Sequence, residues 1–250
     1  MNIVHLSTTL GLDDENEYLL VFDEGNFDAT GTTFNIADWI THTPKAILAQ
    51  NFGVNASVFD SVPTSGPTIL NSTASSAPDA AVGLTGNSSY IFHQSQTATV
   101  PVPGGGGNLS IVDSRNFPIS KTIAATIVSL EPGGLRELHW HPNAEEWLYF
   151  HRGTARATVF IGTTNARTFD FGPGDTAVFP DNSGHYIQNT GKENLVWIEI
   201  YKSDRVADIS LTQWLALTPA DIVAATLKVP LTVVSSLKKE KQILIKGSPE

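Results

Sequence analysis

The chain has no cysteine and only one methionine among its 250 residues. Without cysteine, no disulfide can cross-link the fold, and no thiolate can act as a nucleophile or as a zinc ligand. The absence also means that redox chemistry says nothing about the compartment in which the protein works. Any catalytic or metal site has to be built from nitrogen and oxygen donors.

Basic residues are also scarce, with 15 Lys and Arg against 25 Asp and Glu and a formal net charge of −10. Phosphate binding needs a basic patch, and the one basic run, 238–241, contains Glu240, so we expect a solvated face and no nucleic-acid partner. No stretch reaches the roughly 18 apolar residues of a spanning helix, and the N-terminal stretch lacks a basic segment followed by an apolar run. We therefore expect no membrane partner and no targeting signal in the given sequence.

Short apolar segments separated by turn residues dominate the second half of the sequence. The expected strands are 122–130, 137–141, 146–151, 155–161, 167–171, 175–179, 185–189 and 195–201. Gly, Pro and Asn stand between them, as at Gly133-Gly134 and Pro173-Gly174. This spacing predicts an antiparallel sandwich or barrel, with a helical region outside it and an edge strand at 242–246.

A repeat joins the two ends of the chain. Trp214 stands 175 positions after Trp39, and both lie in segments whose apolar residues have helical spacing. A short apolar strand precedes each segment, Leu19–Phe22 in the first copy and 195–201 in the second. The first copy lacks the strands that would complete its sheet, so we expect Leu19–Phe22 to pair with the complete unit or with another subunit.

The simplest division of the chain has three parts. Residues 1–54 are the remnant of a first unit, and residues 111–250 form a complete second unit with a helical tail. Residues 55–110 are rich in Ser, Thr, Gly, Pro and Ala and are expected to be a linker or a wrapping arm. N-glycosylation sequons, which slightly favour a secreted glycoprotein, fall in this arm at Asn55, Asn71, Asn87 and Asn108.

Two short stretches carry three imidazoles and one carboxylate that form a metal-ligand set: His139, His141, Glu146 and His185. Residues two apart on a strand share a face, so His139 and His141 enter the barrel together. After a turn, Glu146 can return opposite them, while His185 comes from another strand. Such a set leaves two adjacent octahedral positions open, which suits manganese or ferrous iron and a bidentate oxyanion, whereas tetrahedral structural zinc would leave none.

The spacing of these residues is more specific than the residues themselves. Residues 133–153 follow G-x5-H-x-H-x4-E-x6-G, and residues 174–189 follow G-x5-P-x4-H-x3-N. This double pattern resembles the two cupin motifs at every metal position. Asn182 stands where the second motif usually has glycine, but Asn tolerates a positive φ, and both Asn182 and Gly184 can adopt left-handed conformations in the turn before His185.

A closer resemblance extends over residues 17–54 and 110–229. RELHWHPNAEEW, GHYIQNTG and EIYKSDRVADISLTQWLALTP resemble the C-terminal cupin of the bicupin oxalate decarboxylases of fungi and bacteria, and 17–54 resembles the end of their N-terminal cupin. The resemblance implies a mainly β fold, a cupin jelly-roll barrel with flanking helices and an N-terminal remnant of a second cupin. It also implies a manganese enzyme, extracellular or in the cell wall, that splits oxalate into formate and carbon dioxide with dioxygen (O2) as a cofactor.

By the same resemblance, Arg136 holds the substrate carboxylate and Glu199 is the proton donor. A guanidinium can pair with a carboxylate, and a carboxyl group buried near a metal can be tuned to deliver a proton. Strict alternation would turn Arg136 outward, three residues before His139, so a β-bulge is needed to bring it in. Glu199 shares its parity with Trp197 and Tyr201, which fits either the barrel interior or a surface ladder.

Three functions stay open from the sequence. The first is a decarboxylase that uses manganese, with ferrous iron (Fe2+) as the less favoured metal. The second is an oxalate oxidase, which shares the ligands and forms hydrogen peroxide because it does not protonate the intermediate. The third is a metal-binding cupin of structural or storage type, since the family's lid glutamate belongs to an N-terminal cupin that this sequence lacks. Both enzymes act on a small dicarboxylate, oxalate, and all three are compatible with a homo-oligomer.

Overall fold

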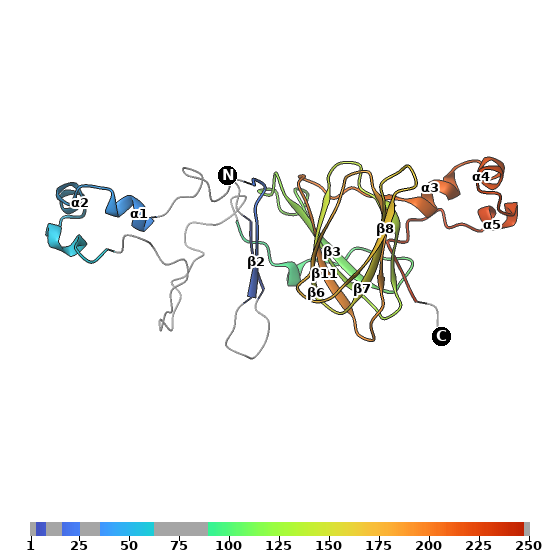
Figure 1. Cartoon of the computed structure of the whole chain (residues 1–250), viewed down its shortest axis with the longest axis horizontal. Helices are drawn as coiled ribbons and strands as arrows, with labels where there is room; N and C mark the ends of the chain where they lie inside the picture. Colours follow the sequence, from blue (N-terminus) through green and yellow to red (C-terminus); the bar gives the residue numbers. More distant parts are fainter. Residues whose placement is uncertain (1–3, 9–16, 26–35, 63–89, 248–250) are drawn as a thin grey trace. The chain divides into compact units, whose positions relative to one another are not determined.

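The computed structural model describes residues 4–8, 17–25, 36–62 and 90–247 (Figure 1). The chain divides into two units, Met1–Asp23 with Leu84–Glu250, and Glu24–Gly83. The first unit holds all of the described strands, and the second holds a small group of helices. The three-part division at 54 and 110 remains a prediction.

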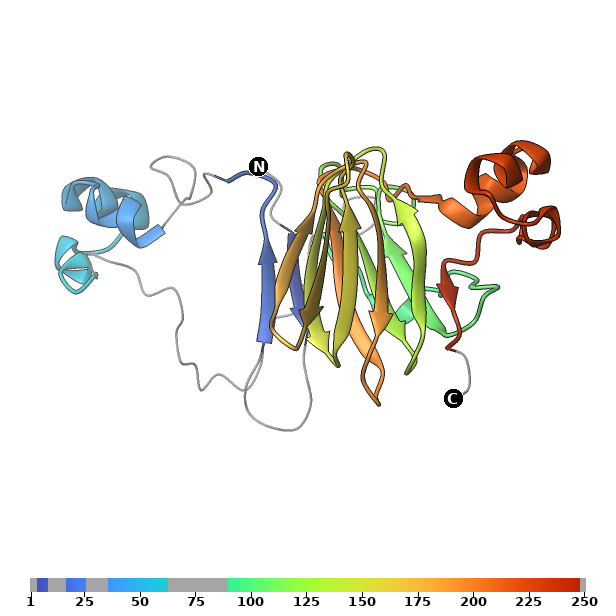
Figure 2. The ribbon, with the colours of Figure 1, turned by 45° about the vertical axis from the view of Figure 1, so that its right-hand side comes forward.

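The barrel of the first unit is built on two antiparallel sheets (Figure 2). One has the strand order β12-β5-β10-β7-β8, with β13 also paired to β5, and the other has the order β3-β4-β11-β6-β9. The strands are β3 (Gly107–Val112), β4 (Ala124–Leu130), β5 (Leu135–Trp140), β6 (Glu146–Arg152), β7 (Ala155–Phe160), β8 (Ala166–Phe171), β9 (Thr176–Phe179), β10 (Gly184–Asn189), β11 (Leu195–Tyr201), β12 (Ile209–Ser210) and β13 (Leu244–Ile245). The predicted mainly β barrel is confirmed, and the edge strand predicted at 242–246 is β13.

Two turns near the metal-ligand residues depend on a left-handed backbone. Gly153 has a φ of 86°, and a Cβ atom there would lie 2.9 Å from the Cα of Leu195, so a larger residue would clash. Asn182 has a φ of 57°, as predicted. Gly184 does not use its freedom to adopt a left-handed backbone, because it pairs with Phe160 as the first residue of β10.

Inward-facing positions change from apolar to polar along the strands. On β11, Leu195 and Trp197 belong to the core, and Glu199 follows on the same face. On β6 the order is reversed, so that Glu146 precedes the core residue Phe150. Other core side chains between the sheets are Leu109, Val128, Leu130, Leu148, Ala157 and Ile187. The apolar part holds the two sheets together, and the polar part contains the candidate site.

The N-terminal strand β2 (Glu17–Val21) pairs antiparallel with β1 (Val4–Thr8) in a separate two-stranded sheet. The predicted pairing of this strand with the barrel is therefore wrong, because VHLST supplies a partner that is much closer along the chain. The side chains of Leu19 and Val21 pack instead against an apolar cluster of the first unit, formed by Ile123, Ala125, Ile198 and Ile200.

The repeat across 175 positions is visible in the helices. The second unit has α1 (Ile36–Thr41), α2 (Lys45–Phe52) and the short helix η1 (Ala56–Phe59); the first has η3 (Gln94–Gln96), α3 (Leu211–Leu217), α4 (Ala220–Leu227) and α5 (Leu231–Ser235). Thr43 Oγ1 donates to Trp39 O at 2.8 Å, and Thr218 Oγ1 donates to Trp214 O at 2.9 Å. Proline precedes α2 and α4 alike, and each is followed by a left-handed residue.

No helix among the described residues is long and apolar enough to cross a membrane.

Candidate metal centre

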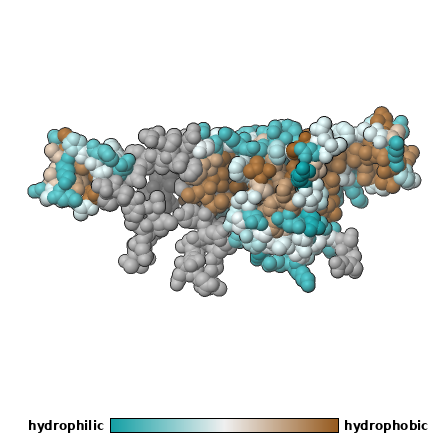
Figure 3. All heavy atoms as spheres, viewed as in Figure 1, coloured by the Kyte–Doolittle hydropathy of each residue, from teal (hydrophilic) through white to brown (hydrophobic). Residues whose placement is uncertain are grey.

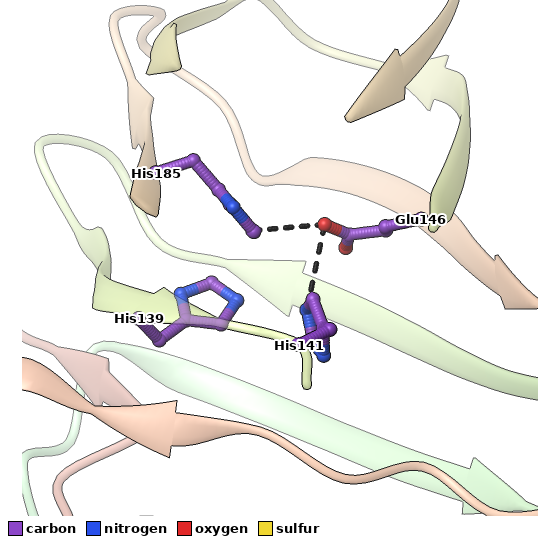
Figure 4. Close-up of side chains that lie close together, drawn as sticks. All are labelled: His139, His141, Glu146 and His185. Carbon is purple, nitrogen blue, oxygen red and sulfur yellow. Dashed lines mark ion pairs between the residues drawn. The ribbon is translucent and has the colours of Figure 1, made fainter. Parts of the chain in front are cut away.

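Four buried side chains converge inside the barrel (Figure 4). His139 lies on β5, His141 follows directly after that strand, Glu146 begins β6, and His185 lies on β10. One ligand atom from each lies within 4.8 Å of the other three. Glu146 Oε2 lies 2.8 Å from His185 Nε2 and 3.5 Å from His141 Nε2. The structure therefore brings together all four residues that the sequence pattern selected.

Each imidazole is oriented by a hydrogen bond between its Nδ1 and a backbone carbonyl. The three pairs are His139 with Glu137 O at 2.7 Å, His141 with Ala207 O at 2.9 Å, and His185 with Ser183 O at 2.9 Å. With Nδ1 as the donor, each Nε2 is left as an acceptor that faces the other side chains.

Three of the converging atoms make no hydrogen bond to any described residue, although two of them, Glu146 Oε2 and His185 Nε2, face each other at 2.8 Å. They are Nε2 of His139, Nε2 of His185 and Oε2 of Glu146, and all three are buried. Buried polar atoms are nearly always paired, so three unpaired ones in one place require an explanation. A divalent cation supplies it, because imidazole nitrogen and carboxylate oxygen are its ordinary ligands.

Strand pairing explains how residues far apart in sequence meet. His185 on β10 lies directly opposite His139 on β5. The next pair joins Ile187 to Arg136, so β5 has one residue more than β10 between the two pairs. This is the β-bulge that the alternation argument required, and it turns Arg136 into the interior with only 2% of its surface exposed.

Burial and mutual charge set the protonation of His139, His141 and Glu146. Burial, together with the charge of Arg136, lowers the pKa of His139 well below its ordinary value. Burial has the same effect on His141, but the Glu146 carboxylate outweighs it and raises the pKa of His141. Burial would raise the pKa of Glu146, yet His185 and His141 beside it hold that pKa below its usual range. Near neutral pH, Glu146 is therefore an anion and His139 is neutral, which are the forms that bind a metal.

Arg136 lies beside these side chains and has one donor to spare. Its Nε is 3.5 Å from Glu199 Oε1, and its Nη2 donates to Asp208 Oδ2 at 2.7 Å. Its Nη1 is buried and has no hydrogen-bond partner within the described part of the chain. A buried, unpaired guanidinium donor is suited to an anionic ligand.

Glu199 is completely buried, which places it in the barrel interior and not on a surface ladder. Its Oε2 accepts from Tyr201 OH at 2.8 Å, and its Oε1 accepts from Trp197 Nε1 at 3.1 Å. Burial raises the pKa of Glu199; Arg136 opposes this effect and the negative charge of Glu146 adds to it. A carboxyl group with a raised pKa can keep a proton and deliver it to a substrate.

Sequence reasoning missed the side chains that hold Arg136 and the bulge in place. Asp208 accepts from Arg136 and also from the Lys241 ammonium group, whose Nζ in turn donates to Asp208 O at 3.0 Å. Glu137, inside the bulge, accepts from Ser210 Oγ at 2.8 Å and from Ile243 N at 3.0 Å. No periodic pattern marks these residues, because their partners are distant in the sequence. Asp208 lies 72 positions from Arg136, and Glu137 lies 106 positions from Ile243.

A two-sheet antiparallel barrel that encloses three imidazoles and one carboxylate defines a metal-binding jelly-roll protein. The family model described as Cupin matches residues 95–234. The chain belongs to the cupin family.

Relatives of known name extend the similarity over most of the chain. It is 60% identical, over 94% of its length, to a protein of Arthroderma benhamiae named "Probable oxalate decarboxylase", of which it covers 59%. It is 42% identical to oxalate decarboxylase OxdC of Bacillus subtilis, with 94% of this chain and 61% of the relative covered. A solved structure of the Bacillus subtilis oxalate decarboxylase at pH 4.6 is similar with a TM-score of 0.77 and 38% identity, over 93% of this chain and 61% of the other. The chain thus spans about three fifths of the length of these relatives.

Proposed function

We propose that the protein is a manganese-dependent, oxalate decarboxylase-like cupin that converts oxalate into formate and carbon dioxide with dioxygen as a cofactor. One observation carries the proposal: the buried four-residue ligand set, the unpaired Nη1 of Arg136 and the buried Glu199 lie together in the barrel interior. The names of the relatives support the choice of oxalate among small dicarboxylates.

His139, His141, Glu146 and His185 are the residues that would hold the metal. Manganese, with dioxygen, supplies the redox chemistry and the positive charge that activate an oxalate dianion. Three imidazoles and one hard carboxylate suit manganese or ferrous iron, and manganese is the metal proposed here because the residues resemble those of manganese enzymes. Their hydrogen-bonded Nδ1 atoms keep the three rings in the orientation that ligation needs.

Arg136 and Glu199 would act directly on the substrate. Arg136 Nη1 donates to a carboxylate oxygen and stabilises negative charge, while Asp208 keeps the other end of the guanidinium fixed. Glu199 delivers its proton to carbon. In the net reaction the carbon–carbon bond of oxalate breaks, one carbon leaves as carbon dioxide, and the other takes the proton from Glu199 and leaves as formate.

We expect protein purified without chelator to contain about one equivalent of manganese per chain. Supplied with oxalate in air at acidic pH, it should release formate and carbon dioxide. Elemental analysis measures the metal, and separate assays measure formate and hydrogen peroxide. Peroxide in place of formate would assign an oxalate oxidase, and metal without either product would assign the unproductive, storage-type cupin. Protein without any transition metal would contradict the metal assignment itself.

We also infer that the protein forms homo-oligomers through its C-terminal helices. Apolar surface gathers over these helices (Figure 3), and the exposed side chains include Trp214, Leu217, Ile222, Leu227, Leu231 and Val233. A contiguous apolar surface on exposed helices is typical of a protein–protein contact.

Replacing both Trp214 and Leu217 by serine is expected to weaken this assembly by at least about tenfold, because large buried aromatic and aliphatic side chains carry most of the binding energy of an interface. Sedimentation velocity at several protein concentrations measures the effect. Asp221→Asn, an exposed polar position on α4, is the matched control. A wild-type protein that sediments as a monomer at every concentration would contradict the inference.

A further inference from the structure

Thr126 on β4 carries a buried hydroxyl that takes no part in metal ligation, in the contacts of Arg136 or in those of Glu199. The residue is 3% exposed, and its Oγ1 has no hydrogen-bond partner among the described residues. Burying an unpaired hydroxyl opposes folding, so such a group is uncommon in a native protein without a function. Its position in the barrel suggests what that function is.

Thr126 faces the barrel interior at the level of Glu199. Residues alternate along β4: Val128, on the same face as Thr126, belongs to the core between the sheets, whereas Ala125 belongs to the outer apolar cluster. Thr126 is also the direct partner of Glu199 across the β4–β11 pair. Directly opposed residues on one face have Cβ atoms about 4.5–5.5 Å apart, so the hydroxyl lies next to the Glu199 side chain.

No described residue forms a hydrogen bond with this hydroxyl. The oxygens of Glu199 accept from Trp197, Tyr201 and Arg136. Within the described part of the chain, Thr126 Oγ1 and Arg136 Nη1 are buried side-chain atoms of this interior that are unpaired and do not belong to the ligand set. These two donors come from facing sheets, since β4 and β5 belong to different ones. Two free donors beside one carboxyl group are suited to a small anion.

We propose that Thr126 is a substrate-binding residue whose hydroxyl donates a hydrogen bond to a carboxylate oxygen of the bound dicarboxylate, beside the oxygen that takes Arg136 Nη1. This role rests on the proposed function and adds a third substrate contact to Arg136 and Glu199. The unpaired hydroxyl costs stability in the free protein and is satisfied when the substrate binds.

Thr126→Val removes the hydroxyl and keeps the shape of the side chain. We expect oxalate affinity to fall by roughly tenfold or more, the usual effect of losing a hydrogen bond to a charged group. Calorimetric titration of the manganese-loaded protein without dioxygen measures binding in the absence of turnover. In the steady state, KM should rise by the same factor and kcat should change by less than about threefold, because the hydroxyl binds ground state and transition state alike.

Stability distinguishes a substrate contact from a purely structural role, for which Thr126→Val would lower the stability of the fold. For a substrate contact the expected result is different. Thr126→Val should retain its manganese and unfold at the same urea concentration as the wild type or a higher one, because a buried unpaired hydroxyl has been removed. Thr126→Ser, which keeps the hydroxyl, should restore most of the affinity. Thr122→Val is the matched control, since Thr122 Oγ1 is also buried and unpaired but lies before β4 begins, and its loss should leave affinity unchanged.

Two outcomes would overturn the inference, and they are distinguishable. If the wild type binds oxalate and Thr126→Val binds it as tightly, Thr126 is not a substrate contact and the proposed function stands. If the wild type binds no oxalate although it contains manganese, the proposed function fails and the role of Thr126 fails with it.

Discussion

Glu146→Gln is expected to purify with less than about a tenth of the manganese found in the wild type, since even an outer partner of a metal ligand is worth about 10–100-fold in affinity. Formate production should be lost with the metal. Glu146 supplies the one negative charge among the four converging side chains, and its Oε2 is the atom closest to His185 and His141. Glutamine keeps the volume but offers a weaker, neutral oxygen to a divalent cation.

Glu145→Gln is the matched control for this variant. It makes the same chemical change one position earlier, where the side chain is exposed and accepts a hydrogen bond from Trp147 Nε1 at 3.0 Å. Elemental analysis after gel filtration compares the two proteins, and circular dichroism checks that both are folded. A Glu146→Gln protein that kept a full equivalent of manganese would remove Glu146 from the ligand set.

The four converging residues were predictable because the relevant signals are local. His139 and His141 share a face through strand parity, and left-handed turns at Gly153 and Asn182 position the strands that follow. Each of these features needs only a few neighbouring residues. The spacing of the two motifs therefore predicted the site without knowledge of the strand order.

The remaining groups depend on pairings that no local pattern records. Arg136 faces inward only because β5 has an extra residue opposite β10. Asp208 and Lys241 reach Arg136 from the far end of the chain. Thr126 lies in the strand AATIVSL, whose sequence is typical of a buried strand and does not mark Thr126 as a site residue. That its hydroxyl lacks a hydrogen-bond partner among the described residues is known only from the surrounding side chains.

Strand pairing also explains the wrong prediction for the N-terminal strand. The segment 19–22 is apolar and has no obvious partner in the sequence, which predicts pairing with the complete unit or with another subunit. VHLST alternates apolar and polar residues, but only over Val4 to Ser7, which is too short a run to identify β1 from the sequence alone. The apolar residues of β2 still contact the barrel through their side chains, which satisfies the hydrophobic pattern without a backbone pair.

Glu199→Gln is expected to keep its manganese and to bind oxalate, yet to form formate about 10²–10⁴-fold more slowly, the usual contribution of a positioned general acid. Glutamine fills the same buried space between Trp197 and Tyr201 but has no proton to deliver. Formate and manganese are measured on the same preparation, with Glu193→Gln, an exposed carboxylate, as the matched control. Full formate output from Glu199→Gln would remove this residue from the mechanism.

The pH dependence of the wild type gives an independent check on the same group. Burial raises the pKa of Glu199, so its protonated form persists above the pH at which an ordinary glutamate ionises. A general acid works only while it holds its proton. Formate production should therefore be highest below this raised pKa and fall as the pH rises through it. In Glu199→Gln this decrease of formate production with rising pH should be absent. Any peroxide that replaces the lost formate would show that protonation by Glu199 decides between the two products.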